Sequence, residues 1–300
     1  DRLEKINNGK LTRTAIEALF LEIFAISRNL ELPENVAYLG PEGSFTHQAA
    51  EGRFGAMSSY VSISSIKGIF REVSTKKAKF GVVPIENSSN GIVTDTINSF
   101  SKYDLKIVAE VVLDIHHTLA STCDKIENIK RIYSKDIAFE QCRRFLSNFG
   151  LDEVELIPIE STTKAAKLAA KEPYSAAICP HVGAKLHNLP ILFENIEDKD
   201  NNKTRFFIIS DFENASSGND KTSVLVELPD RQGALVEILK DFNNAVINLT
   251  KIKSHIVEGN SIFFIDFDGH KNDEHIKPVL QKHNKTVKLL GSYVKEINDI

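Results

Sequence analysis

The stretch FGVVPIENSSNG, at residues 80–91, decides the fold class of this chain. Residues 80–85 are an uninterrupted apolar run, which is typical of a strand buried on both faces in an α/β sheet. A carboxylate, amides and hydroxyls follow at once. Open α/β sheets bind ligands beyond the carboxyl ends of their strands, so Glu86, Asn87 and Ser88 are candidate site residues. The alternative is a polar turn that caps the next helix.

Further short apolar runs extend this pattern along the chain. They lie at 36–39, 107–113, 131–133, 154–158, 176–179 and 206–209, and helical patterns separate them. One of these helices begins at Ser64 or Ser65, either of which can cap it, and carries apolar residues at helical spacing. The alternation predicts an α/β sheet domain.

The two ends of the chain follow other patterns. Residues 16–30 carry an apolar stripe at three- and four-residue spacing, which predicts an amphipathic helix ending before Pro33. Residues 213–220, ENASSGND, have no periodicity and predict a flexible linker. Beyond it we expect strand 222–228, helix 233–243, strands 246–256 and 260–267, helix 272–283 and strand 287–294, a ferredoxin-like βαββαβ order.

Composition restricts the functional classes. The chain of 300 residues has a net charge of −4 without a basic run, so we expect no nucleic-acid partner and no membrane contact. Its three cysteines, Cys123, Cys142 and Cys179, match no zinc spacing and favour reduced thiols in a cytoplasmic protein. A small molecule is the expected partner.

Residues 38–46, YLGPEGSFT, leave a strand, turn on two glycines and enter a helix. Free N–H groups at the start of a helix attract anions, so Gly43 and Ser44 are candidate carboxylate binders. An ordinary strand-to-helix turn is the alternative, since short glycine motifs often occur without function.

Thr204 and Arg205 open the strand expected at 206–209. A threonine hydroxyl can donate a hydrogen bond to a leaving oxygen, and a guanidinium can bind a carboxylate through two hydrogen bonds. The histidines, among them His116, His117 and His181, form no metal-binding spacing and are predicted to be structural. No P-loop or GxSxG motif occurs, and we expect neither metal nor cofactor.

Five motifs in order resemble the prephenate dehydratase family. They are GPEGSFTHQAA (40–50), PIENSSNG (84–91), the EQC that ends SKDIAFEQC (134–142), ESTTKAA (160–166) and TRF (204–206). The resemblance implies two α/β lobes like those of periplasmic binding proteins, at 35–212, with the second lobe at about 114–189. It also implies that prephenate loses carbon dioxide and its ring hydroxyl to give phenylpyruvate.

The resemblance also implies roles for individual residues. Thr204 would be the catalytic hydroxyl, with Glu86 and Asn87 beside it. Ser88, Ser134, Gln141 and Glu160 would bind substrate, together with Gly43, Ser44 and Arg205. The family usually has His-Pro after the serine, whereas this chain has Lys135 and Asp136.

Residues 221–300 resemble the ACT regulatory domain of this family, with L-phenylalanine as the implied effector. The implied effector-binding residues are Gly233, Ala234, Leu235, Val236, Asn248, Leu249 and Ser254. Where the family has Glu-Ser-Arg-Pro, this chain has Lys253, Ser254, His255 and Ile256.

The first segment, 1–32, resembles the last helix of a chorismate mutase domain. The resemblance implies that most charged substrate contacts of a mutase site lie on earlier helices that are not in this sequence, so mutase activity is not expected of the residues given. A homodimer or homotetramer through the ACT domains is expected. The alternative function is a non-catalytic, two-lobed sensor of an amino acid or small acid, since fold does not determine function.

Overall fold

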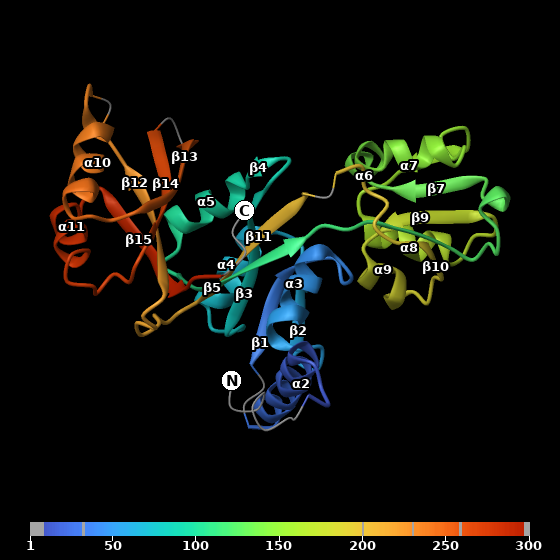
Figure 1. The fold of residues 1–300 in the computed structure, drawn as a ribbon, viewed down its shortest axis with the longest axis horizontal. Coiled ribbons are helices and arrows are strands. Elements are labelled where there is room, and N and C mark those ends of the chain that lie inside the picture. The colour runs from blue at the N-terminus through green and yellow to red at the C-terminus, as the bar shows by residue number, and fades with distance from the viewer. Residues whose placement is uncertain (1–8, 32–33, 200, 230, 258–259, 297–300) are drawn as a thin grey trace.

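A computed structural model describes residues 9–31, 34–199, 201–229, 231–257 and 260–296. Figure 1 shows three bodies side by side, with one long helix below the middle one. The middle and right-hand bodies are two α/β lobes, and the left-hand body contains the last strands and helices of the chain. The two-lobed α/β architecture expected from sequence is therefore confirmed.

The first lobe is the middle body. Its elements are β1 (Asn35–Leu39), α3 (Phe45–Phe54), β2 (Ser59–Ile63), α4 (Ile66–Ser74), β3 (Phe80–Asn87), β4 (Gly91–Ile92), α5 (Thr94–Lys102), β5 (Lys106–Asp114) and β11 (Lys203–Ser210). The sheet order is β2-β1-β3-β11-β5, with β4 paired to β3. The late strand β11 lies antiparallel between β3 and β5, which places it at the centre of the lobe.

The second lobe is the right-hand body of Figure 1. It contains β6 (Thr118–Ser121), η1 (Ile126–Asn128), β7 (Arg131–Ser134), α6 (Asp136–Gln141), α7 (Arg143–Asn148), β8 (Glu155–Pro158), α8 (Thr162–Ala169), β9 (Ser175–Cys179), α9 (His181–Leu186) and β10 (Ile191–Phe193). The sheet order is β10-β6-β9-β7-β8. Because β10 pairs with β6, this sheet extends past residue 189, where the sequence placed the end of the lobe.

The C-terminal body contains β12 (Asp220–Glu227), α10 (Ala234–Asn244), β13 (Leu249–Val257), β14 (Asn260–Asp268), α11 (Lys277–Lys282) and β15 (Val287–Val294). Its sheet order is β13-β14-β12-β15. The elements follow the predicted order, although α11 is shorter than expected. Its helices share one apolar core with the sheet, and Leu225, Phe264 and Tyr293 belong to a second core that includes first-lobe residues.

Two contacts join the C-terminal sheet closely to the first lobe. At Gly291 of β15 an added Cβ would lie 2.2 Å from the carbonyl oxygen of Ile107, so only glycine fits this approach to β5. The amide of Asn214 donates to the carbonyl oxygens of Val108 (2.7 Å) and Ser292 (3.2 Å). The segment predicted to be a flexible linker is thus bonded to both bodies, and β12 already begins at its last residue, Asp220.

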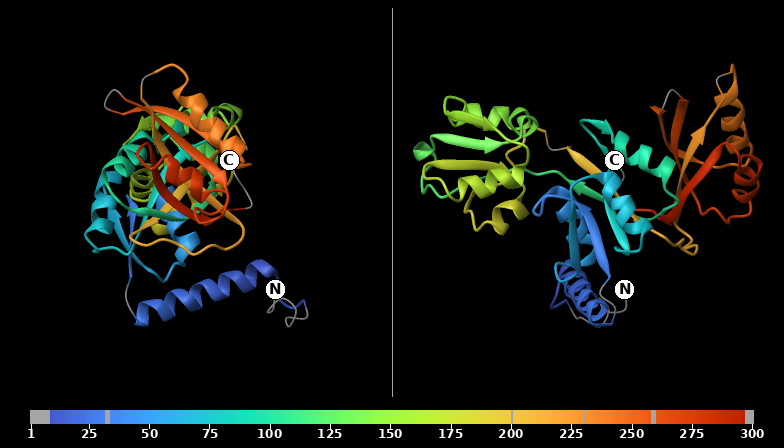
Figure 2. Two further views of the ribbon diagram at one scale, coloured as in Figure 1. Left: turned by 90° about the vertical axis from the view of Figure 1, so that its left-hand side faces the viewer. Right: turned by 180° about the vertical axis from the view of Figure 1, so that it is seen from behind.

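Helix α2 (Arg13–Glu31) lies apart along the lower edge of the molecule, as the left panel of Figure 2 shows. The carboxylate of Glu22 accepts hydrogen bonds from the backbone N–H groups of Ala56 (2.8 Å) and Met57 (3.2 Å). Ala25 is buried, but Leu19, Ile23 and Phe24 are each more than half exposed. Its apolar stripe is therefore only partly covered.

Four short strands were not predicted as strands: β2, β4, β6 and β10. Strands β2, β4 and β6 carry too few consecutive apolar residues to stand out from a turn or a helix end, and β10 is only three residues long. No described helix has the length and hydrophobicity needed to cross a bilayer.

Candidate active site between the lobes

A cavity of about 280 Å³ lies between the two lobes. The lobes are connected where β5 leads to β6 and where β10 leads back to β11, as Figure 1 shows. The first lobe contributes the turn after β1, the end of β3 and the start of β11. The second lobe contributes the first turns of α6 and α8. The polar lining includes Ser44, Thr46, Asn87, Asn90, His117, Lys135, Gln141, Glu160, Ser161, Thr162, Thr163, Asn202 and Thr204.

Thr204 and Asn87 form a pair at the wall of this cavity. They are opposite one another in the antiparallel register of β11 and β3. Nδ2 of Asn87 donates to Oγ1 of Thr204 over 2.8 Å. The hydroxyl oxygen is thus an acceptor in this bond, and its own hydrogen has no acceptor among the described residues. Thr204 can donate that hydrogen to a ligand in the cavity.

The orientation of the Asn87 amide is determined by its surroundings. Its Oδ1 accepts hydrogen bonds from the backbone N–H groups of Ser89 (2.9 Å) and Asn90 (3.0 Å), as in an Asx turn. Its Nδ2 also lies 2.9 Å from Oδ1 of Asn202. Ser88, which was predicted to bind substrate, does not line the cavity. Its exposed Oγ donates to the carbonyl oxygen of Asn201 (3.0 Å).

Helix N-termini surround the cavity. Oγ of Ser44 accepts from His47 N (3.3 Å) at the start of α3, and Oγ of Ser161 accepts from Lys164 N (3.1 Å) at the start of α8. Helix N-termini carry a partial positive charge that favours anions. The predicted role of Ser44 fits this position. Gly43 lies instead against the second lobe, where an added Cβ would come within 3.1 Å of Gly183 Cα.

His117 is a site residue that the sequence analysis assigned to structure alone. It is buried, and its Nε2 lies 2.9 Å from Oε1 of Gln141. Burial lowers the pKa of the imidazole, so it is neutral at neutral pH, with the hydrogen on Nε2 and an acceptor at Nδ1. His117 follows the carboxyl end of β5, and the strand-end rule that indicated Glu86 could have indicated it too.

Two buried polar atoms in the cavity wall have no hydrogen-bond partner within the described chain. They are Nδ1 of His117 and Oγ1 of Thr163. A buried polar group without a partner costs about 1–3 kcal/mol, and a bound ligand can supply the missing bond. Thr163 lies in the ESTTKAA motif, next to the Glu160 that was singled out from it.

Glu160 and Ser134 differ in how well they match their predicted roles. Glu160 lines the cavity, and its exposed carboxylate is paired with Lys164. Ser134 is fully buried and donates to the carbonyl oxygen of Ile178 over 2.7 Å. The structure therefore places the Ser134 hydroxyl inside the second lobe and outside the cavity lining, whereas the neighbouring Lys135 lines the cavity.

Arg205 is directed away from the cavity, contrary to the prediction that it binds a substrate carboxylate. Its side chain is fully buried, with Nε 2.7 Å from Oε2 of Glu110 and Nη1 2.6 Å from Oδ2 of Asp266. Burial opposes its charge, but the carboxylates of Asp266 and Glu110 outweigh this effect and hold its pKa above the usual value. Successive side chains of a strand point to opposite faces, so Thr204 and Arg205 cannot both face the cavity.

Glu86 also faces the C-terminal sheet. Its buried carboxylate is paired with Lys251, and one oxygen lies 3.4 Å from Nζ of Lys253. The register of β3 and β11 shifts between Arg205 and Phe206, so one residue of β3, Ile85, is unpaired. Such a bulge interrupts the alternation of side chains, so that Glu86 and buried Ile85 lie on the same face of the sheet. The structure therefore does not bring Glu86 together with Thr204 in the cavity lining.

The predicted effector residues lie on two elements of the C-terminal body. Gly233, with φ +83°, precedes α10, and the first turn of that helix holds buried Ala234 and half-exposed Val236. Leu235 packs against the core of this body. Asn248 donates to Oδ2 of Asp268 over 2.7 Å next to β13, and Leu249 and Ser254 belong to β13 itself.

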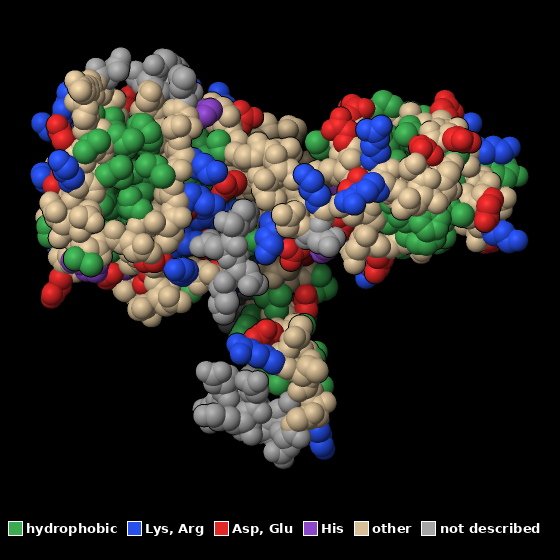
Figure 3. All heavy atoms as spheres, turned by 45° about the horizontal axis from the view of Figure 1, so that its top comes forward, with side chains coloured by type: hydrophobic (Ala, Val, Ile, Leu, Met, Phe, Trp, Pro, Cys, Tyr) green, Lys and Arg blue, Asp and Glu red, His purple; other side chains and the backbone are tan. Residues whose placement is uncertain are grey.

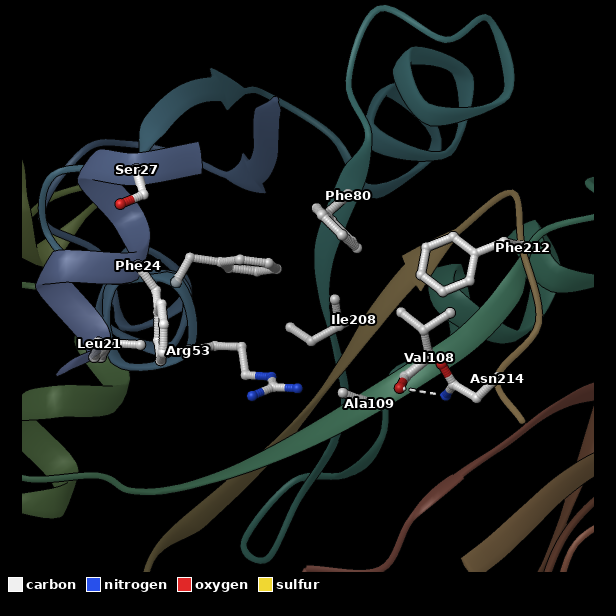
Figure 4. Close-up of a pocket in the computed structure, with 11 residues that line it drawn as sticks. Leu21, Phe24, Ser27, Arg53, Phe80, Val108, Ala109, Ile208, Phe212 and Asn214 are labelled. Carbon is white, nitrogen blue, oxygen red and sulfur yellow. Dashed lines mark hydrogen bonds between the residues drawn. The ribbon is translucent and has the colours of Figure 1, made fainter. Parts of the chain in front are cut away.

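A second cavity, of about 540 Å³, lies between α2 and the first sheet. Figure 4 shows Phe24 of α2 on one side, Phe80 and Phe212 on the other, and the Arg53 side chain extending between them. Its walls are mostly apolar, and it shares no lining residue with the cavity between the lobes.

The family model of prephenate dehydratase matches residues 36–214, which contain every element of both lobes except the first residue of β1. This chain belongs to the prephenate dehydratase family. It is 39% identical over 303 residues to the bifunctional chorismate mutase/prephenate dehydratase of Aquifex aeolicus, covering 99% of this chain and 83% of that protein. It is 38% identical over 271 residues to the prephenate dehydratase of Methanocaldococcus jannaschii, covering 86% of this chain and 97% of that one.

A solved prephenate dehydratase has a similar fold over most of the chain. The Arthrobacter aurescens enzyme in complex with L-Phe has a TM-score of 0.79 and 33% identity, covering 87% of this chain and 90% of that one. Prephenate dehydratases are lyases, and this member carries the predicted Thr204 and Asn87 in a cavity between its two lobes.

Proposed function

We propose that prephenate is dehydrated in the cavity between the lobes, with Thr204 as the hydrogen-bond donor to the leaving hydroxyl. The observation that carries this role is the Thr204–Asn87 pair, in which the amide occupies the oxygen lone pair and leaves the hydroxyl hydrogen available. The TRF motif at 204–206 and its neighbour PIENSSNG support the same assignment.

The reaction is an elimination. The bond between the ring and its carboxylate breaks, its electron pair enters the ring, and the ring C–O bond breaks as hydroxide departs and takes up a proton. Aromatisation drives the step, so the protein has to orient the substrate and stabilise the departing oxygen. A positioned donor to a developing negative charge contributes about 2.7–4 kcal/mol to such a step.

The substrate carries two carboxylates, and the cavity offers suitable places for them. The starts of α3 and α8, at Ser44 and Ser161, supply N–H groups and positive dipole ends. Lys135 adds a cation from the second lobe. Gln141 and the neutral His117 lie between these elements as further polar contacts.

Replacing Thr204 tests the assignment. In Thr204→Ala we expect kcat for phenylpyruvate formation to fall by about 100-fold or more, with little change in melting temperature. The matched control is Thr96→Ala, because Thr96 is a buried threonine in α5 whose Oγ1 bonds the carbonyl oxygen of Pro84, away from the cavity lining. An unaltered kcat in folded Thr204→Ala, or no phenylpyruvate from the wild-type chain, would contradict the proposal.

The C-terminal body is, in this proposal, an ACT domain that binds L-phenylalanine near Gly233, Ala234 and Leu235. The L-Phe complex of the Arthrobacter relative supports it. Figure 3 shows hydrophobic side chains gathered on this left-hand body, which fits a homodimer or homotetramer formed through it. Calorimetry with L-phenylalanine, and mass measurement with and without it, test both points; absence of heat and of any effect on kcat would contradict the effector role.

Helix α2 is proposed to be the last helix of a chorismate mutase domain. The relative from Aquifex aeolicus that aligns with it is named as bifunctional, and the exposed Leu19, Ile23 and Phe24 form a face that other helices could cover. The cytoplasm is the proposed location, because Cys123, Cys142 and Cys179 are free thiols.

A further inference from the structure

Strands β11 and β3 each direct one side chain to the cavity and the neighbouring one to the C-terminal sheet. In their register, Thr204 is opposite Asn87, and Arg205 is opposite Glu86. The first pair is hydrogen-bonded at the cavity wall. Both members of the second pair are ion-paired to residues of the C-terminal sheet. Thr204 is joined to Arg205 by a peptide bond in β11, and Asn87 is joined to Glu86 by a peptide bond in β3. Each cavity residue is therefore adjacent in sequence to a residue held by the C-terminal sheet.

The Arg205 side of this arrangement is fully enclosed. Its guanidinium contacts Glu110 of β5, Asp266 of β14 and, over 3.0 Å, the hydroxyl of Tyr293 in β15. Ser223 of β12 bonds the other oxygen of Asp266 over 2.5 Å and lies 2.6 Å from the Tyr293 hydroxyl. Three strands of the C-terminal sheet therefore hold one first-lobe side chain.

The charges in this cluster are balanced. Nζ of Lys221, itself 1% exposed, lies 3.0 Å from Oε1 of Glu110, so two cations meet two carboxylates. Removing one partner of a buried ion pair leaves the other charge buried and uncompensated, so displacing either partner is strongly unfavourable. The position of Arg205 is thus tied to the position of the C-terminal sheet.

The Glu86 side is more accessible. Lys251 and Lys253, both on β13, meet its carboxylate. Figure 3 shows Lys and Arg side chains gathered at the border between the C-terminal body and the first lobe. Lys253 adds a second cation to Lys251 beside the Glu86 carboxylate, which strengthens the attraction between this carboxylate and β13.

We propose that Arg205 and Glu86 are positioning residues, through which Asp266 and Lys251 of the C-terminal sheet determine the geometry of the Thr204–Asn87 pair. The inference rests on the proposed function of that pair. A movement of the sheet displaces the backbone of β11 and β3 at the residues next to the hydroxyl donor. Ligand binding to the C-terminal body can thereby change turnover without contacting the cavity.

Asp266→Asn tests the proposal, because the change preserves shape, removes the charge that holds Arg205 and lies outside the cavity lining. We expect kcat for prephenate to fall by about tenfold, as a small displacement of a catalytic group produces, with KM changed by less than about twofold. In a Thr204→Ala background, the same change should alter the residual kcat by less than about twofold, because the group it positions is gone.

Three results would overturn the inference. They are a folded Asp266→Asn variant with wild-type kcat, an effect on KM alone, and an equal loss of kcat with and without Thr204. The last would show that Asp266 supports the fold in general. A wild-type chain that makes no phenylpyruvate would instead reject the proposed function, so the two failures are distinguishable.

Lys251→Met provides the second variant, since this lysine is nearer the surface than Asp266. The same fall in kcat is expected, again absent in the Thr204→Ala background, and Lys251→Arg should restore the rate by restoring the ion pair. A folded Lys251→Met variant with unaltered kcat, or a Lys251→Arg variant as slow as it, would contradict the Glu86 part of the proposal.

Discussion

Thr204 and Arg205 are neighbours in the chain, yet their side chains lie in different surroundings. Thr204 lines the cavity and receives a hydrogen bond from Asn87. Arg205 is enclosed among carboxylates and joins the first lobe to the C-terminal sheet. Arg205 was predicted as a substrate binder from the chemistry of its guanidinium. The direction of its side chain places it instead in the interface between the first lobe and the C-terminal sheet.

The direction of the Asn87 amide leads to a prediction at this scale. In Asn87→Asp a carboxylate oxygen replaces the donor and accepts the hydrogen of Thr204, which the leaving group then lacks. We expect kcat to fall by about 100-fold, comparable to the loss of an oxyanion donor. Steady-state assays on prephenate measure the effect, with the melting temperature as control; kcat within about twofold of wild type would refute this account of the pair.

His117 predicts a dependence of stability on pH. Burial lowers its pKa, whereas in the unfolded chain the imidazole titrates near pH 6.5. Between the lowered pKa and about 6.5 the unfolded state binds more protons, so this group's contribution to stability is present above about pH 6.5 and is lost as pH falls through that window.

Urea unfolding at about pH 5 and about pH 7.5 tests this expectation in the wild type and in His117→Gln. The free energy of unfolding should fall toward acid pH by more in the wild type than in the variant. Equal pH dependence in wild type and His117→Gln would show that burial of His117 has no such effect.

At the level of secondary structure, the position of β11 between β3 and β5 brings the site residues together. This strand returns from the second lobe and pairs antiparallel with β3, bringing Thr204 to an amide 117 positions earlier in the chain. The starts of α3 and α8 complete the cavity from opposite lobes. Strand ends and helix starts thus supply most of the polar wall.

Two serine caps give a matched comparison. Ser44 caps α3 at the cavity, and Ser65 caps α4 outside its lining through a 3.2 Å bond from Gly68 N. Alanine at either position should lower the free energy of unfolding by about 1 kcal/mol. Only Ser44→Ala should also raise KM for prephenate, because the carboxylate loses an ordered helix start. Equal KM values in both variants would argue against α3 as a carboxylate site.

At the scale of the whole molecule, the C-terminal sheet and the first lobe form one packed unit. Phe207 and Ile209 of the first lobe share a core with Leu225 and Phe264, while the second lobe has cores of its own. The second lobe is connected to this unit through two crossings of the chain. We expect the joined unit to unfold separately from the second lobe.

Gly291→Ala should show this division, because the new Cβ would clash with Ile107 O. In calorimetry the transition of the first lobe and C-terminal sheet should shift to lower temperature, by more than about 4 °C. The second-lobe transition should remain. Gly52→Ala, where an added Cβ meets no atom within 4 Å, is the control. A single transition, or equal shifts of both, would contradict the division.

Hydrophobic periodicity predicted the α/β class and the order of most elements, because it is a local property of the chain. The two lobes were expected only from the resemblance of five motifs to a known family. It placed Thr204, Asn87, Gln141 and Ser44 among the site residues, and the cavity contains them. Alternation along a strand also shows that Thr204 and Arg205 face opposite sides.

Which of the two sides faces the cavity follows from tertiary packing alone. That choice depends on the surface that packs against each face, and here the C-terminal sheet takes the face of Arg205. The bulge at Ile85 moved Glu86 to the same face, since an extra residue interrupts the alternation that sequence reasoning relies on. The cavity lining also includes His117 but not Ser134, whose hydroxyl bonds the backbone of Ile178. Burial and hydrogen-bond partners of this kind arise only when distant segments meet.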